Sequence, residues 1–147
     1  MIDYKIAIVI SQFNQEISDK LLEGAINAYK ELCNNLDNIT VYKVPGAFEV
    51  PGAVSQILTK MINYDAIVTL GAVIKGETAH FEYISESVTN SISKLSLEAR
   101  IPIIYGILNS YDYNQAIKRA SYNKLDKGGE AMKAAFEVIE TYRKINN

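Results

Sequence analysis

The segment Leu-Gly-Ala-Val-Ile-Lys-Gly-Glu-Thr-Ala-His-Phe, residues Leu70–Phe81, decides how the chain is expected to fold. Its apolar first half is typical of a strand buried on both faces, whereas Gly76 interrupts the strand and Thr78 is suited to open a helix. His80, the only histidine, follows in the first turn of that helix. Free N–H groups at a helix start attract anions, and a histidine can transfer a proton near neutral pH. Taken alone, however, an ordinary glycine turn beside a solvated histidine explains the segment more simply.

Segments of the same two kinds alternate along the rest of the chain. Apolar, β-branched runs predict strands at Lys5–Ile10, Ile39–Val44, Asp65–Val73 and Pro102–Ile107. Capping residues and helical periodicity predict helices over Asn14–Cys33, Pro51–Ile62, Thr78–Arg100, Asp112–Ala120 and Glu130–Lys144. Strands that alternate with helices over short connections form parallel sheets. We therefore predict an α/β, flavodoxin-like three-layer sandwich, with a four-stranded parallel sheet in the order 2-1-3-4 and helices on both faces.

The predicted sheet also indicates where a ligand would bind. Such sheets bind ligands beyond the carboxyl ends of their strands, where the strand order reverses. Here the reversal falls between the first and third strands, so the loops Ser11–Asn14 and Ile74–Thr78 border the expected crevice. Phe13 lies in the first loop, where it is suited either to stack on a flat heterocycle or to close the end of the core. The Pro45–Pro51 segment is expected to be an extended loop that presents the backbone of Ala47–Glu49.

Composition excludes several functional classes. The 147 residues are expected to form one domain over 1–147, and the net charge of −2 comes with dispersed basic residues. That balance argues against nucleic acid or an anionic membrane as a partner. No apolar run reaches the roughly 20 residues of a membrane span, and Met1–Lys5 leads straight into a strand, unlike a signal peptide. We therefore expect a cytoplasmic protein.

The motif content excludes the common cofactor sites. Cys33 is the only cysteine, so the chain has no intrachain disulfide and no cysteine-rich metal site. Neither a Walker A pattern nor a dinucleotide-binding Gly-x-Gly-x-x-Gly occurs. The chain is therefore expected to need no metal and no organic cofactor. Arg119 and Lys127 are suited to bind phosphate, although each is also explained as a solvated surface charge.

Four segments together resemble the 6,7-dimethyl-8-ribityllumazine synthase family of riboflavin biosynthesis. They have the order and spacing of that family and comprise Phe13-Asn14, Pro45–Pro51, Gly71–Phe81 and Lys127–Ala131. The resemblance implies a reaction: 5-amino-6-(D-ribitylamino)uracil condenses with 3,4-dihydroxy-2-butanone 4-phosphate to form 6,7-dimethyl-8-ribityllumazine. Phosphate and water are lost, and no cofactor takes part.

The resemblance also implies a role for each candidate residue. His80 would transfer protons. The backbone of Glu77 and Thr78 would receive the phosphate, with Arg119 as its charged clamp. The pyrimidine and its ribityl chain would contact Phe13, Ala47, Phe48, Glu49, Ala72, Val73, Ile74, Tyr105 and Lys127.

The resemblance further implies a homo-oligomer whose sites lie between subunits. One chain would supply Tyr105, Arg119 and Lys127, and its neighbour would supply residues such as Phe13 and His80. The assembly would be a pentamer or an icosahedral shell of twelve pentamers, and the lack of an insertion between Arg119 and Lys127 favours the shell. A riboflavin synthase would be a partner enzyme.

Some positions depart from the family pattern. Gln12 and Lys75 stand where arginine is frequent, and Tyr105 stands where phenylalanine is usual. Asn109-Ser110 replaces a threonine pair, and the segment before Lys127 lacks the usual glycine.

Two alternative functions are an archaeal-type riboflavin synthase and a non-catalytic flavin- or lumazine-binding shell protein. The intact Gly76–Phe81 and Pro45–Glu49 segments argue against the first. The joint presence of His80, Arg119 and Lys127 argues against the second.

Overall fold

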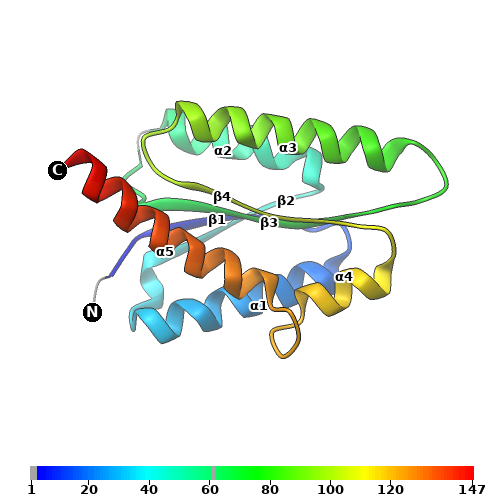
Figure 1. Cartoon of the computed structure of the whole chain (residues 1–147), viewed down its shortest axis with the longest axis horizontal. Helices are drawn as coiled ribbons and strands as arrows, with labels where there is room; N and C mark the ends of the chain where they lie inside the picture. The colour runs from blue at the N-terminus through cyan, green and yellow to red at the C-terminus, as the bar shows by residue number, and fades with distance from the viewer. Residues whose placement is uncertain (1–2, 61) are drawn as a thin grey trace.

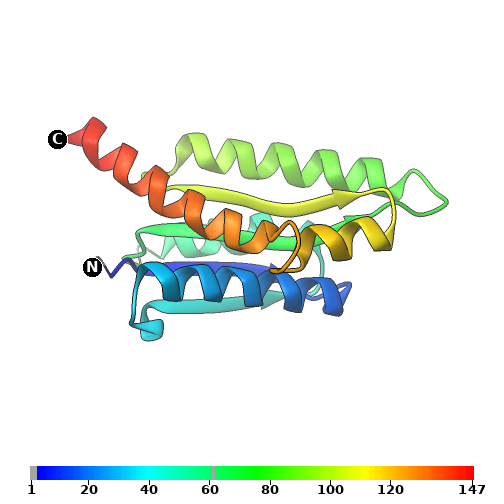
Figure 2. The ribbon, with the colours of Figure 1, turned by 60° about the horizontal axis from the view of Figure 1, so that its bottom comes forward.

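One parallel sheet forms the centre of the molecule. A computed structural model describes residues 3–60 and 62–147, and within them four strands have the order β2-β1-β3-β4, which confirms the predicted topology (Figure 2). The strands are β1 Ile6–Ser11, β2 Ile39–Val44, β3 Ala66–Ile74 and β4 Ile103–Ser110. All neighbours pair in parallel. Consequently β4 is an edge strand, and every strand ends at the same side of the sheet.

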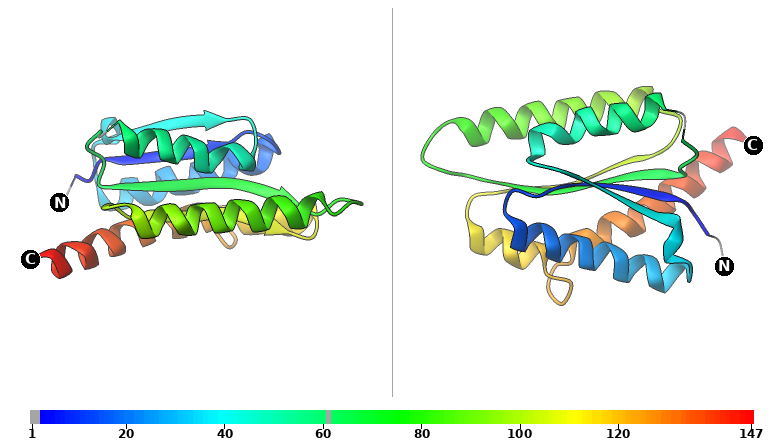
Figure 3. Two further views of the ribbon diagram at one scale, coloured as in Figure 1. Left: turned by 90° about the horizontal axis from the view of Figure 1, so that it is seen from above. Right: turned by 180° about the vertical axis from the view of Figure 1, so that it is seen from behind.

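Helices cover both faces of this sheet, as predicted (Figure 1). One face carries α2 Val50–Thr59 and α3 His80–Glu98. The opposite face carries α1 Gln15–Leu32, α4 Tyr113–Ala120 and α5 Lys127–Asn146. Figure 3 shows the same three layers from above and from behind. Two short 3-10 helices, η1 Leu36–Asn38 and η2 Ala47–Glu49, precede β2 and α2.

The core explains why the strands read as continuous apolar runs. Every residue of β1 is buried. Its side chains alternate, so that Ile6 and Ile8 pack in the core layer under α1 and α5, whereas Ala7 and Val9 pack in the layer under α2 and α3. A strand covered on both faces therefore shows no polar alternation in its sequence.

The fourth strand is longer than predicted, because it continues through Gly106 to Ser110. An added Cβ at Gly106 would lie 2.4 Å from the carbonyl oxygen of Thr69. This glycine therefore permits close packing on β3 and does not end the strand. The extension pairs Asn109 and Ser110 with the end of β3.

The last helix begins earlier than the predicted start at Glu130, because α5 begins at Lys127. Asp126 takes the left-handed conformation, with φ 47°, and its side chain accepts a hydrogen bond from Gly129 N at 3.1 Å. Aspartate tolerates this conformation, so no glycine is needed at the turn. An added Cβ at Gly128 would lie only 2.0 Å from the carbonyl oxygen of Leu21 in α1. The glycine therefore serves the contact between two helices.

Other element boundaries differ less. Asn14 precedes α1 but takes the left-handed conformation, with φ 64°, and makes no side-chain cap. Helix α2 ends at Thr59, and the predicted helical residue 61 lies outside the described residues. Helix α3 begins at His80, whose N–H donates to the Thr78 hydroxyl at 3.3 Å. None of the helices within 3–60 and 62–147 is long and apolar enough to cross a membrane.

We expect Gly128→Ala to lower the free energy of unfolding by about 3 kcal/mol, because the new methyl group collides with the backbone of α1 and cannot move aside. Urea unfolding at one protein concentration measures the change. Gly52→Ala is the matched control, because no atom lies within 4 Å of the added Cβ and alanine favours a helix. Equal stability of the two variants would contradict this account of the α1–α5 contact.

Candidate functional site

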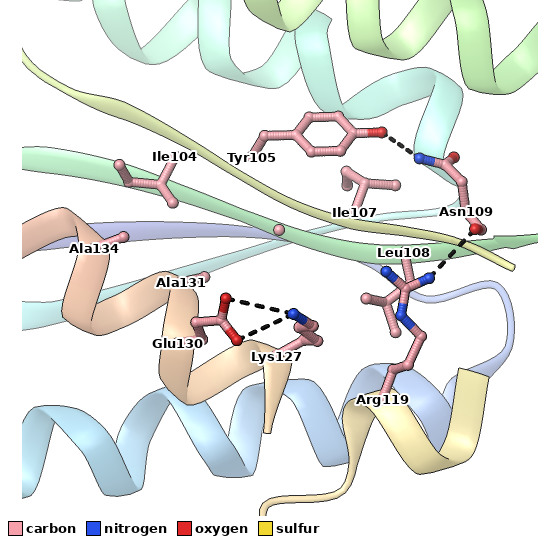
Figure 4. A pocket seen from close by; sticks show the side chains of 11 residues that line it. Ile104, Tyr105, Ile107, Leu108, Asn109, Arg119, Lys127, Glu130, Ala131 and Ala134 are labelled. Carbon is pink, nitrogen blue, oxygen red and sulfur yellow. Dashed lines mark hydrogen bonds and ion pairs between the residues drawn. The ribbon is translucent and has the colours of Figure 1, made fainter. Parts of the chain in front are cut away.

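A groove of about 330 Å³ runs along the outer edge of β4 (Figure 4). Side chains from both faces of β4 border it, together with the end of α4 and the first turns of α5. Its lining residues are Ile104, Tyr105, Gly106, Ile107, Leu108, Asn109, Arg119, Lys127, Glu130, Ala131 and Ala134. Three of the candidate residues, Tyr105, Arg119 and Lys127, therefore come together in one groove.

Arg119 is half-buried near the end of α4 and points toward the end of β4 (Figure 4). The helix is held at its start by Asp112, whose carboxylate accepts from Gln115 N at 2.8 Å, as the sequence predicts. The Arg119 Nη1 lies 3.4 Å from the Asn109 carbonyl oxygen and 3.5 Å from the Ser110 hydroxyl. A guanidinium has five N–H donors, and these two contacts engage only Nη1. The remaining donors are suited to an anion.

Lys127 begins α5 and is paired with Glu130, a residue that the sequence analysis did not select. The Lys127 Nζ lies 3.1 Å from Oε2 and 3.4 Å from Oε1 of Glu130. The spacing of three residues on one helix could have indicated this pair. Glu130 is itself a lining residue of the groove, so the groove contains a carboxylate acceptor as well as its two cations.

Tyr105 lies on the opposite face of β4, toward α3. Its hydroxyl lies 2.9 Å from the Thr89 hydroxyl and 2.6 Å from Nδ2 of Asn109. The ring remains 37% exposed at the rim of the groove. Two departures from the family pattern, Tyr105 and Asn109, are thus bonded to each other. The sequence analysis did not identify Thr89, because 16 residues separate it from Tyr105.

A second group of candidate residues lies at the carboxyl ends of the inner strands. Gln12 N donates to the Val44 carbonyl at 2.8 Å, and Phe13 N donates to the Pro45 carbonyl at 2.9 Å. These bonds continue the β1–β2 ladder past the end of both strands. The Phe13 ring is nevertheless 71% exposed, so a firmly held backbone presents it to solvent.

The Ala47–Glu49 segment is a 3-10 helix and not the extended loop that the two prolines predict. Gly46 N donates to Oε1 of Glu49 at 3.0 Å, and Glu49 N donates to the Gly46 carbonyl at 3.1 Å. This reciprocal pair closes the turn. The first N–H groups of a helix have no partner within it, so those of Ala47 and Phe48 are suited to ligand oxygens. Phe48 and Glu49 also line a groove of about 570 Å³ beside α2 and α3.

The end of β3 and the loop after it carry the remaining candidates. Ala72 and Val73 are buried and Ile74 is half-buried, whereas Glu77, Thr78 and His80 are exposed. The loop begins at Lys75, whose N–H donates to the Ser110 carbonyl at 2.9 Å.

The Lys75 side chain contacts two residues outside this loop, Glu82 in α3 and Tyr111 after β4. Its Nζ lies 3.9 Å from Glu82 and 5.6 Å from the centre of the Tyr111 ring, which contacts Phe81 at a centroid distance of 6.3 Å. Tyr111 is a third residue that the sequence analysis did not select. Its ring and the Glu82 carboxylate hold the lysine that replaces an arginine of the family pattern.

The two groups of candidates do not share the groove at β4. Phe13 and His80 are absent from its lining residues, which come from β4, α4 and α5 alone. One chain therefore offers an aromatic and cationic groove, and separately offers exposed aromatic rings on other segments and an imidazole at the start of α3. In the described part of the chain, no cluster of three or more His, Cys, Asp or Glu residues could hold a metal ion.

Comparisons with known proteins agree with the sequence resemblance. The model of the 6,7-dimethyl-8-ribityllumazine synthase family matches residues 3–143. Proteins of that name from Chlorobium luteolum and Yersinia pestis are each 42% identical to the chain, over 96% of its length and 90% of theirs. Another, from Chlorobium phaeovibrioides, is 43% identical with the same coverage. The chain belongs to the 6,7-dimethyl-8-ribityllumazine synthase family.

Proposed function

We propose that the chain condenses 5-amino-6-(D-ribitylamino)uracil with 3,4-dihydroxy-2-butanone 4-phosphate to give 6,7-dimethyl-8-ribityllumazine. The family match over residues 3–143 carries this proposal. The groove at β4 supports it chemically, because an aromatic ring, a guanidinium and an ammonium are the groups that a flat heterocycle and a phosphate require.

The pyrimidine substrate is assigned to the exposed aromatic rings. Phe13 and Tyr105 pack on its ring, and Lys127 meets its carbonyl side. The N–H groups at the start of η2 and the Glu49 carboxylate hold the ribityl hydroxyls. The strand residues Ala72, Val73 and Ile74 form the edge of this subsite. The exposure of Phe13 supports the assignment, since 71% of a large apolar side chain faces solvent.

The phosphate substrate is assigned to the loop before α3 and to Arg119. Backbone N–H groups of Glu77 and Thr78 and a guanidinium are both suited to phosphate oxygens. The exposed loop and the uncommitted donors of Arg119 support this assignment.

His80 is assigned to proton transfer between the two subsites. The 5-amino nitrogen attacks the ketone carbon, water leaves to form an imine, and phosphate departs. The ribitylamino nitrogen then attacks the remaining carbonyl carbon, and loss of a second water completes the ring. An imidazole can accept and return the protons of these steps at neutral pH. Holding the reactive amine and ketone together supplies much of the rate acceleration. His80 therefore adds a smaller acceleration to this effect of proximity.

A complete site is assigned to the interface of two subunits. This arrangement is supported by the separation of the candidates, because Phe13 and His80 are absent from the lining of the groove that contains Arg119. We propose a homopentamer as the basic assembly and a shell of twelve pentamers as its larger form. A riboflavin synthase would use the lumazine product.

We expect the purified protein, mixed with both substrates, to form the lumazine chromophore faster than the uncatalysed mixture. Absorbance and product fluorescence measure the rate. A control incubation with lumazine alone is expected to yield no riboflavin. A rate at the uncatalysed background would refute the proposed reaction, and riboflavin in the control would identify the archaeal-type riboflavin synthase instead.

We expect Arg119→Ala and His80→Ala to affect different kinetic constants. Loss of hydrogen bonds to a charged phosphate should raise KM for the phosphate substrate about 10- to 100-fold in Arg119→Ala. Loss of the proton relay should lower kcat about 10-fold in His80→Ala, with small effects on KM. Lys118→Ala, an exposed neighbour on α4, is the control and should match the wild type. A wild-type KM in Arg119→Ala refutes the clamp.

We expect the two variants to complement each other when they assemble together, because a shared site regains both groups where unlike subunits meet. The variants are co-expressed with different tags and purified through both. Activity below saturation should then exceed the mean of the two parent proteins, and light scattering should give at least a pentameric mass. Activity equal to that mean, or an active monomer, would place the whole site in one chain.

A further inference from the structure

Four polar groups join into a single row beside the groove at β4. Asn109 Nδ2 lies 2.6 Å from the Tyr105 hydroxyl, and that hydroxyl lies 2.9 Å from the Thr89 hydroxyl. The Thr89 hydroxyl in turn lies 2.6 Å from the carbonyl oxygen of Ser85. The row therefore connects the edge strand β4 to α3 through the ring of Tyr105.

Only one arrangement of protons satisfies the whole row. A carbonyl can only accept, so the Thr89 hydroxyl gives its single proton to Ser85. Thr89 must then accept from Tyr105, whose single proton is thereby used. Tyr105 must in turn accept from Asn109, which agrees with the amide nitrogen facing the phenol oxygen. Each hydroxyl in the row donates once and accepts once.

We propose that Thr89 and Asn109 are positioning residues that hold the Tyr105 ring in one orientation at the rim of the groove. The ring needs such support, because it belongs to an edge strand and is 37% exposed. A rigid ring loses less conformational freedom when a ligand packs on its face, so affinity rises without a new contact. The inference rests on the proposed function, which assigns this ring to the pyrimidine substrate.

The test separates an effect on the ring from an effect on the fold. Thr89→Val keeps the shape of the side chain but removes the acceptor for Tyr105. We expect it to raise KM for the pyrimidine substrate about three- to tenfold, the effect of one lost hydrogen bond, and to leave KM for the phosphate substrate unchanged. Thr89→Ser keeps the hydroxyl and should restore the wild-type KM. Asn90→Ala, the exposed next residue, is the control.

A double-mutant cycle with Tyr105→Phe completes the test. Once the phenol hydroxyl is gone, Thr89→Val should add no further increase in KM for the pyrimidine substrate. Additive effects, an unchanged KM in Thr89→Val, or a failure of Thr89→Ser to rescue would overturn the positioning role while wild-type lumazine formation stands. If the wild-type protein forms no lumazine, the proposed function fails first and this inference fails with it.

Discussion

The groove at β4 depends on how closely α5 approaches two other parts of the backbone. At Gly128 the helix meets the Leu21 carbonyl of α1, where any Cβ would fall within 2.0 Å. At Gly106 the strand lies under α5, and an added Cβ would come 3.3 Å from that of Ala131. These two glycines let α5 form one wall of the groove and β4 its floor. Lys127 gains its position from this packing, because it is the first residue of the helix.

Most of the fold could be predicted because its signals are local. Strands buried on both faces are short apolar runs, and helices that cover a sheet show an apolar stripe. The predictions failed beside Gly106 and Gly128, because the fourth strand continues past Ile107 and the last helix begins before Glu130. The function of these two glycines is to accommodate a neighbouring backbone, and that neighbour is distant in sequence. Asp126 takes the left-handed conformation before α5 for a local reason, since its side chain accepts a hydrogen bond from Gly129 N.

The candidate site could be predicted only where a single segment contains a recognisable motif together with its candidate functional side chain. The motifs around Phe13, Glu49 and His80 identified loops that do lie at the carboxyl ends of the strands. Partners supplied by other elements were not evident. Thr89 lies on a different element from the tyrosine it contacts, and Tyr111 meets Lys75 from the end of the next strand. Sequence motifs identify candidate ligand-binding residues more readily than the residues that hold the side chains of those candidates in place.

The alternation of side chains along β4 has a consequence for how recognition can change. Tyr105 and Asn109 lie on the face toward α3, whereas Arg119 and Lys127 approach from the side of α4 and α5. The strand thus separates the Tyr105 ring from these two cationic side chains, although all three line the same groove. The hydroxyl of Tyr105 bonds to Thr89 and the Asn109 amide, whereas Arg119 contacts the Asn109 carbonyl and the Ser110 hydroxyl. In the proposed site, the packing of the Tyr105 ring and the phosphate contacts of Arg119 can therefore change separately during evolution.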